Sequence, residues 1–166
     1  MALPTQYPLP GIIGNESTYN RFGDLCPGEF LTKYTFPENG SYKYPDYQGF
    51  LLDTSGKPIL ANITITPGTL LDRFGSEFGT FMSPIGVPYA QRSLPPTNLN
   101  APVNSTFPAN YHVYQVVQSF QVLAGPTAPW FEQMGLSLQF VVPLPVKDLV
   151  SGGFIVPVAK VEQDDL

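Results

Sequence analysis

The sequence predicts a mainly β, small α+β domain with long Pro/Gly-rich loops and one short helix. Two observations favour this class. The 166 residues include 19 prolines and 15 glycines, which favour short elements joined by rigid turns over long helices. Several short segments also alternate between apolar and polar residues, as half-buried strands do. The length is sufficient for one domain with its own core.

The expected elements lie in the central and C-terminal parts of the chain. A turn is expected at Ser55 and Gly56, where the chain has small, flexible residues. Residues 146–150, closed by Gly152, are the only segment that predicts a helix. The predicted strands are residues 63–66, 111–117, 120–123, 136–142 and 154–161.

Residues 1–43 form an aromatic arm that Pro and Gly residues interrupt. We expect this arm to pack on the domain of residues 44–166 or against a second copy of the chain, so a homodimer is left open. Cys26 is the only cysteine, which excludes an internal disulfide. Its thiol either pairs between chains or is buried as a small apolar group, and burial is the preferred interpretation.

Composition limits the functions that the chain can have. The net charge of −5 argues against a nucleic-acid partner, because nucleic acids require a basic surface. No apolar run approaches the length of a membrane span. No signal peptide is evident at Met1, so either such a signal has been removed or the protein is cytosolic. Four Asn-x-Ser/Thr sequons favour a secreted eukaryotic glycoprotein, with glycans expected at Asn15, Asn39, Asn62 and Asn104.

Residues 72–96 contain two of the three arginines, Arg73 and Arg92. The glycines and prolines around them predict a compact, irregular loop. Guanidinium groups pair with phosphates through parallel hydrogen bonds, so two arginines in a chain poor in cations favour a diphosphate ligand. The alternative is two surface arginines in a proline-rich turn.

Six short motifs occur in one order between about residue 44 and residue 150, and together they carry a resemblance to a known family. The chain resembles the tuberculosis necrotizing toxin family of NAD glycohydrolases, including its secreted fungal members. The resemblance implies a mixed, mostly antiparallel sheet distantly like that of ADP-ribosyltransferases. It also implies hydrolysis of NAD or NADP to nicotinamide and ADP-ribose without an organic cofactor. The motifs are Asp72-Arg-Phe-Gly, Phe81-Met-Ser-Pro-Ile-Gly-Val-Pro, Gln91-Arg-Ser-Leu-Pro-Pro, Tyr111-His-Val-Tyr, Ala128-Pro-Trp-Phe and Val146-Lys-Asp-Leu-Val.

The resemblance also implies roles for particular polar residues. Gln139 would be the catalytic amide that orients the water or the ribose hydroxyls, and Gln133 is the competing candidate. Arg73 and Arg92 would bind the substrate phosphates. His112, the only histidine, would hydrogen-bond the ribose or a phosphate, unless it is a packed strand residue.

Aromatic and acidic residues complete the expected site. Phe74 and Phe81 would stack on a substrate ring, although relatives often have tyrosine at the position of Phe81. Trp130 either lines the cleft or belongs to the core. Asp164 and Asp165 lie in an acidic tail where some fungal relatives bind calcium, and the alternative is a solvated tail.

Two other functions remain open. A protein ADP-ribosyltransferase would share the fold, but those enzymes commonly use an acidic Glu-x-Glu motif, which this sequence lacks. The second alternative is a non-enzymatic, glycosylated surface protein that retains only the fold.

Overall fold

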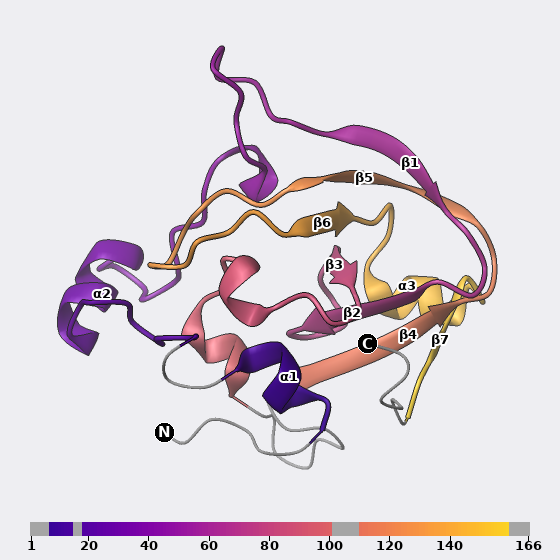
Figure 1. Cartoon of the computed structure of the whole chain (residues 1–166), viewed down its shortest axis with the longest axis horizontal. Helices are drawn as coiled ribbons and strands as arrows, with labels where there is room; N and C mark the ends of the chain where they lie inside the picture. The colour runs from indigo at the N-terminus through magenta and orange to yellow at the C-terminus, as the bar shows by residue number, and fades with distance from the viewer. Residues whose placement is uncertain (1–6, 15–17, 101–109, 160–166) are drawn as a thin grey trace.

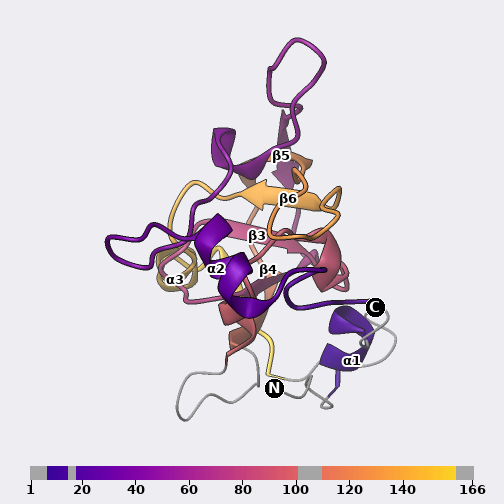
Figure 2. The ribbon, with the colours of Figure 1, turned by 90° about the vertical axis from the view of Figure 1, so that its left-hand side faces the viewer.

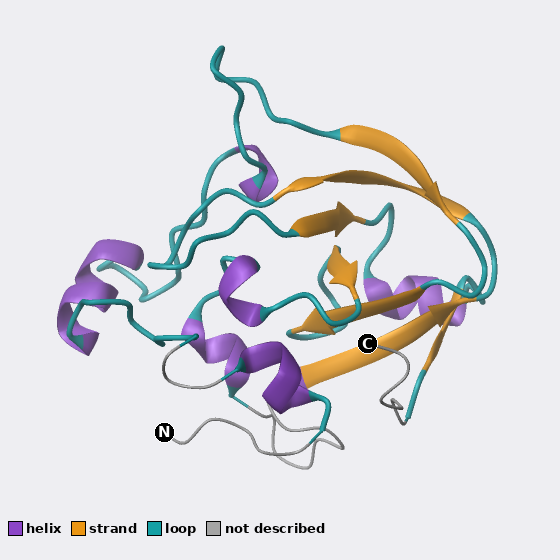
Figure 3. Ribbon diagram, viewed as in Figure 1, coloured by secondary structure: helices purple, strands orange, loops and turns teal. Residues whose placement is uncertain are grey.

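One antiparallel sheet organises the domain. The computed structural model describes residues 7–14, 18–100 and 110–159. Its seven strands lie in the order β1-β5-β6-β3-β2-β4-β7, and every described pairing is antiparallel (Figures 1 and 3). The predicted β-rich, mostly antiparallel class is therefore confirmed. The strands are β1 (Ala61–Ile65), β2 (Leu70–Phe74), β3 (Phe81–Pro84), β4 (Tyr111–Val116), β5 (Phe120–Pro126), β6 (Leu138–Val141) and β7 (Ile155–Pro157).

Five strands and the helix α3 (Val146–Ser151) occur where the sequence predicts them. β5 extends to Pro126, beyond the predicted end at residue 123. β6 begins only at Leu138, because Leu136 has a positive φ of 69° that an extended strand cannot include. Gly56 also has a positive φ of 80°, as the predicted turn requires.

The expectation that residues 72–96 form only an irregular loop is wrong. This segment contains most of β2, all of β3 and the 3-10 helix η2 (Tyr89–Gln91), and it reaches the start of η3 (Pro96–Leu99). β2 includes the charged residue Asp72, which is buried inside the sheet because Arg92 pairs with it. The charge therefore does not prevent a strand here.

β3 is short and joins two halves of the sheet. Its first residues pair with β6, through Phe81 opposite Val141, and its last residues pair with β2, through Ser83 opposite Asp72. In Figure 1, β1, β5 and β6 lie above β3, whereas β2, β4 and β7 lie below it. The two halves diverge around this short strand.

The described part of the N-terminal arm contains two helices, so the expectation of a single helix is wrong. They are α1 (Leu9–Ile13) and α2 (Pro27–Tyr34), the second of which projects at one end of the molecule (Figures 1 and 2). α2 begins with Pro27 at its first position, and the Glu29 carboxylate accepts a hydrogen bond of 3.0 Å from the Cys26 N–H. Cys26 precedes the helix and is exposed, which corrects the expectation of a buried thiol.

Both arm helices share their apolar faces with the rest of the protein. Leu9 and Ile12 of α1 are buried in a cluster with Tyr89. Phe30 and Tyr34 of α2 are buried with Phe131, and aromatic rings meet edge-on or at tilted angles in this cluster. The largest cluster lies between the sheet and α3 and includes Tyr114, Phe140 and Leu149.

None of the helices in the described ranges is long and apolar enough to cross a membrane.

Candidate active site

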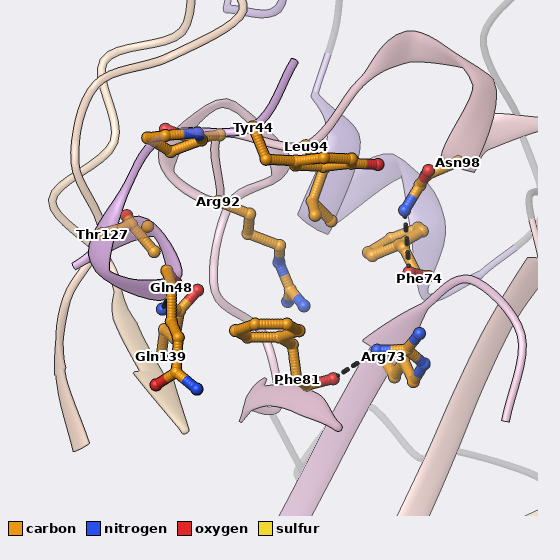
Figure 4. A pocket seen from close by; sticks show the side chains of 13 residues that line it. Tyr44, Gln48, Arg73, Phe74, Phe81, Arg92, Leu94, Asn98, Thr127 and Gln139 are labelled. Atoms are coloured by element: carbon orange, nitrogen blue, oxygen red, sulfur yellow. Dashed lines mark hydrogen bonds between the residues drawn. The ribbon is translucent and has the colours of Figure 1, made fainter. Parts of the chain in front are cut away.

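A cavity of about 420 Å³ lies where the two halves of the sheet diverge. Arg73 and Phe74 at the end of β2 line it, with Phe81 of β3 and Gln139 of β6 (Figure 4). Ligand sites in proteins have volumes of roughly this size and commonly combine aromatic walls with a few polar groups. The other labelled lining residues in Figure 4 are Tyr44, Gln48, Arg92, Leu94, Asn98 and Thr127.

Arg73 presents a cation to this cavity. Its Nε donates a hydrogen bond of 2.7 Å to the Ser76 carbonyl, and its Nη1 donates one of 2.6 Å to the Phe81 carbonyl. No ion pair joins it to a carboxylate in the described part of the chain. Burial lowers the pKa of Arg73 from its usual value, because desolvation disfavours the charged form. The site therefore holds a partly desolvated positive charge without a carboxylate partner.

Arg92 also lines the cavity, but its charge is matched inside the protein. Its Nη1 and Nη2 donate to the two carboxylate oxygens of Asp72 at 2.5 and 2.8 Å, and both groups are buried. Its Nε and Nη2 donate to the Val87 carbonyl at 2.9 and 2.7 Å. Burial raises the pKa of Asp72, and the positive charge of Arg92 opposes that shift. The structure thus uses Arg92 to hold the wall together, and binding of a phosphate by Arg92 stays a prediction.

Of the two candidates for the catalytic amide, Gln139 is the one that lines the cavity. Gln139 and Val141 lie on the same face of β6, and Val141 pairs with Phe81 of β3. The Gln139 amide is therefore on the side of the sheet that carries Phe81. The amide Nε2 donates a hydrogen bond of 2.9 Å to the Gln48 carbonyl, which fixes the side chain. The competing candidate, Gln133, is only 7 % exposed and is not among the lining residues. Its Nε2 donates to the carbonyls of Asn20 and Phe131, so its contacts are structural.

Two of the three predicted aromatic residues line the cavity. Phe81 is 37 % exposed there, whereas Phe74 is 2 % exposed and packs edge-on against Tyr89. Phe81 can therefore offer a ring face to a ligand, whereas Phe74 is a buried part of the wall. Trp130 is not among the lining residues, because its ring packs against Tyr34 and its Nε1 donates to the Lys43 carbonyl at 2.7 Å.

His112 lines a different cavity. It pairs with Arg73 between β4 and β2, but its side chain borders a space of about 240 Å³ together with Glu77 and Tyr114. Its Nε2 lies 3.0 Å from the Asn110 Oδ1. Burial lowers its pKa and favours the neutral imidazole. The structure does not bring His112 to the cavity wall beside Gln139.

The remaining predicted sites divide between the described and undescribed parts of the chain. Asn39 and Asn62 are exposed, as glycosylation requires. Asn15, Asn104, Asp164 and Asp165 lie outside the described residues. Within the described ranges, no group of three or more His, Cys, Asp or Glu side chains could hold a metal ion.

Comparison with known proteins identifies the family. The family model described as tuberculosis necrotizing toxin matches residues 64–158, more than half of the chain. The chain belongs to this family. The predicted resemblance is thereby confirmed, and the matched range contains Arg73, Phe81, Arg92 and Gln139 of the cavity wall.

One relative and one solved structure extend this comparison. The conidial surface nicotinamide adenine dinucleotide glycohydrolase of Aspergillus fumigatus is 49 % identical over 168 residues, which cover 99 % of this chain and 70 % of that protein. The structure of tuberculosis necrotizing toxin complexed with its immunity factor matches with a TM-score of 0.63 at 20 % identity. That match covers 87 % of this chain and 79 % of the toxin chain, and it supports the fold of this family member.

Several residues that line the cavity were not predicted from the sequence. Tyr44 and Gln48 lie in residues 42–50, a segment with three tyrosines that precedes β1. Asn98 belongs to η3, and Thr127 follows β5. The Nδ2 of Asn98 donates to the Phe74 carbonyl at 3.0 Å. The cluster of tyrosines around Tyr44 could have indicated a ligand site in the sequence. The other residues lie in no distinctive local pattern.

Proposed function

We propose that this protein is an NAD glycohydrolase that hydrolyses NAD to nicotinamide and ADP-ribose in the cavity between Arg73 and Gln139. Membership of the tuberculosis necrotizing toxin family supports the activity, as does the 49 % identity to a fungal protein named as an NAD glycohydrolase. The single observation that carries the placement is the guanidinium of Arg73. It is a partly buried cation at the cavity wall whose hydrogen bonds, among the residues that the structure describes, go to carbonyl groups, and an anionic substrate would complete its interactions.

The reaction requires positioning more than acid–base chemistry. The bond between ribose C1′ and the pyridinium nitrogen breaks, and its electron pair passes to the ring, so nicotinamide leaves as a neutral molecule without a proton. Water forms the new bond to C1′ and loses one proton to solvent. The protein must hold the diphosphate, stabilise the electron-poor ribose and orient the water.

The residues of the cavity suit these tasks. Arg73 binds the diphosphate through N–H groups that the protein leaves available. The Nε2 of Gln139 is held by the Gln48 carbonyl, so its Oε1 accepts a hydrogen bond from the attacking water or a ribose hydroxyl. An amide is a weak base but fixes orientation well. The exposed face of Phe81 stacks on the substrate, and the buried Phe74 forms another part of the cavity wall.

NAD or NADP is the substrate in this proposal, and no cofactor takes part in the chemistry. We further propose a cell-surface or extracellular location, because the fungal relative is named as a conidial surface enzyme and exposed sequons occur at Asn39 and Asn62. Structural calcium at Asp164 and Asp165 and a homodimer remain predictions that belong to the same proposal.

The test is release of nicotinamide and ADP-ribose from NAD by the purified protein, followed by liquid chromatography. Equal amounts of both products are expected, since water is the acceptor. Arg73→Ala should lose about 1.5–3 kcal/mol of binding, the range for hydrogen bonds to a charged group, mainly as a raised KM. Arg21→Ala is the matched control, because Arg21 contacts the Pro96 carbonyl and does not line the cavity.

Three outcomes would contradict the proposal. Nicotinamide release without free ADP-ribose would indicate transfer to another acceptor. No release by the folded, glycosylated protein would exclude the activity. Equal values of kcat/KM for Arg73→Ala and Arg21→Ala would remove Arg73 from the phosphate site.

A further inference from the structure

The loop of residues 75–80 encloses the guanidinium of Arg73. Its Nε donates to the carbonyl of Ser76 near the start of the loop, and its Nη1 donates to the carbonyl of Phe81 directly after the loop (Figure 4 shows the second). The outer side of the loop is fixed to the first turn of α3, because the Val146 N–H donates to the Gly79 carbonyl at 3.1 Å. The loop is therefore attached to α3 on its outer side and contacts the Arg73 guanidinium on its inner side.

Gly79 lies in contact with the head of that arginine. A Cβ at this position would lie 1.9 Å from Arg73 Nη2, 2.6 Å from Cζ and 2.9 Å from Nη1. Each separation is shorter than real Cβ atoms tolerate, so the guanidinium as a whole occupies the space of a side chain at position 79.

Backbone conformation does not explain the glycine. Gly75, in the same loop, has a φ of 121°, which L-residues with side chains rarely adopt. The φ of Gly79 lies outside that region, so a left-handed backbone does not account for the glycine. The requirement for glycine at position 79 comes from the space that Arg73 fills.

We propose that Gly79 is a positioning residue that directs the guanidinium of Arg73 to the diphosphate of the substrate. This proposal rests on the function proposed above. A methyl group at position 79 displaces the guanidinium and breaks its bonds to the Ser76 and Phe81 carbonyls together. The fold survives, because the atoms that must move belong to the end of a flexible side chain and not to the backbone.

Kinetics with a matched control test the functional part of the proposal. Gly79→Ala should lower kcat/KM by up to the loss in Arg73→Ala, about 10- to 150-fold, mainly through KM. Gly28→Ala is the control, because a Cβ there meets nothing within 4 Å. The double variant Arg73→Ala/Gly79→Ala should be no worse than Arg73→Ala, since Gly79 acts through Arg73. Losses that multiply in the double variant would overturn the proposal.

Arginine NMR signals test the placement without activity. The protein has three arginines, so three Nε–H signals are expected and point variants can assign them. Gly79→Ala should shift the Arg73 signal and speed its exchange with solvent, because the bond to Ser76 is lost. The Arg92 signal should stay unchanged, since its partners are Asp72 and Val87.

The two measurements separate the failures. An unchanged Arg73 signal in Gly79→Ala would overturn the positioning proposal whatever the kinetics show. A shifted signal together with an inactive wild-type protein would overturn the proposed function and leave the relation between Gly79 and Arg73 standing.

Discussion

Replacing Asp72 by asparagine should strongly destabilise the protein. The Asp72 carboxylate is fully buried and neutralises Arg92, which is 5 % exposed. Asparagine keeps the shape but loses the charge, and its NH₂ group would face an N–H group of Arg92 or the hydroxyl of Tyr111, which also donates to Asp72 at 3.0 Å. Breaking a buried pair so that one charge is left uncompensated costs about 3–5 kcal/mol. Domains of this kind have free energies of unfolding of about 5–15 kcal/mol, so the loss is about a fifth of the total or more.

Urea denaturation measures this change. With a slope of about 2 kcal/mol per M, the midpoint of Asp72→Asn should fall by roughly 1.5–2.5 M. The double variant Asp72→Asn/Arg92→Met removes both charges and should recover a large part of the loss, since an apolar replacement of a buried pair is often tolerated. A loss below about 1 kcal/mol in Asp72→Asn would refute the reasoning. It would mean that Arg92 does not depend on Asp72, and its guanidinium would then be available to bind a phosphate.

Three further predictions concern the catalytic amide, the arm and the surface. Gln139→Ala should lower kcat by about a hundredfold and leave the fold intact, because a misplaced orienting group costs about that much. Gln133→Ala should instead lower the melting temperature and leave kcat nearly unchanged. A large loss of kcat in Gln133→Ala, with kcat kept in Gln139→Ala, would assign the catalytic amide to Gln133. The hydrogen bond from Lys33 lowers the pKa of Glu132 from its usual value of 4.5, so its stabilising effect is present above pH 4.5 and is lost as the pH falls. Denaturation of Glu132→Gln should show lower stability than wild type at pH 7 and a difference that narrows below pH 4.5, and a difference independent of pH would contradict this. Protein from its natural source should carry glycans at one or more of its four sequons, the exposed Asn39 and Asn62 among them, and peptide mapping that finds all four unmodified would contradict secretion through the eukaryotic pathway.

The sequence predicted the elements whose local pattern agrees with their environment. From Phe120 to Ala124, β5 alternates between buried and more exposed residues, because one side of the strand meets the core. β2 was missed because Asp72 and Arg73 interrupt its apolar residues, and only a distant residue, Arg92, makes the carboxylate tolerable there. α2 was missed because Cys26 is an unusual N-cap, although Pro27 followed by Glu29 was a usable start signal.

The site was predictable where family motifs carry it and unpredictable where the fold assembles it. The motifs named Arg73 and Phe81, the resemblance placed a catalytic amide at Gln139, and the structure brings all three to one cavity. The sequence placed His112 on the correct strand. It could not show that the His112 side chain borders a second cavity, because this depends on how β4 pairs with β2. Contacts between distant segments, such as that of Asn98 with Phe74, depend on tertiary packing and leave no periodic signal in the sequence.

The position of bound ADP-ribose tests the central claim most directly. A crystal structure of the complex should show the diphosphate on Arg73 Nη2 and the ribose C1′ beside the Gln139 amide, with Phe81 against the ligand. Arg92 should remain paired with Asp72. Binding of ADP-ribose elsewhere, for example in the cavity beside His112, would contradict the assignment of the cavity between Arg73 and Gln139 as the site of NAD hydrolysis.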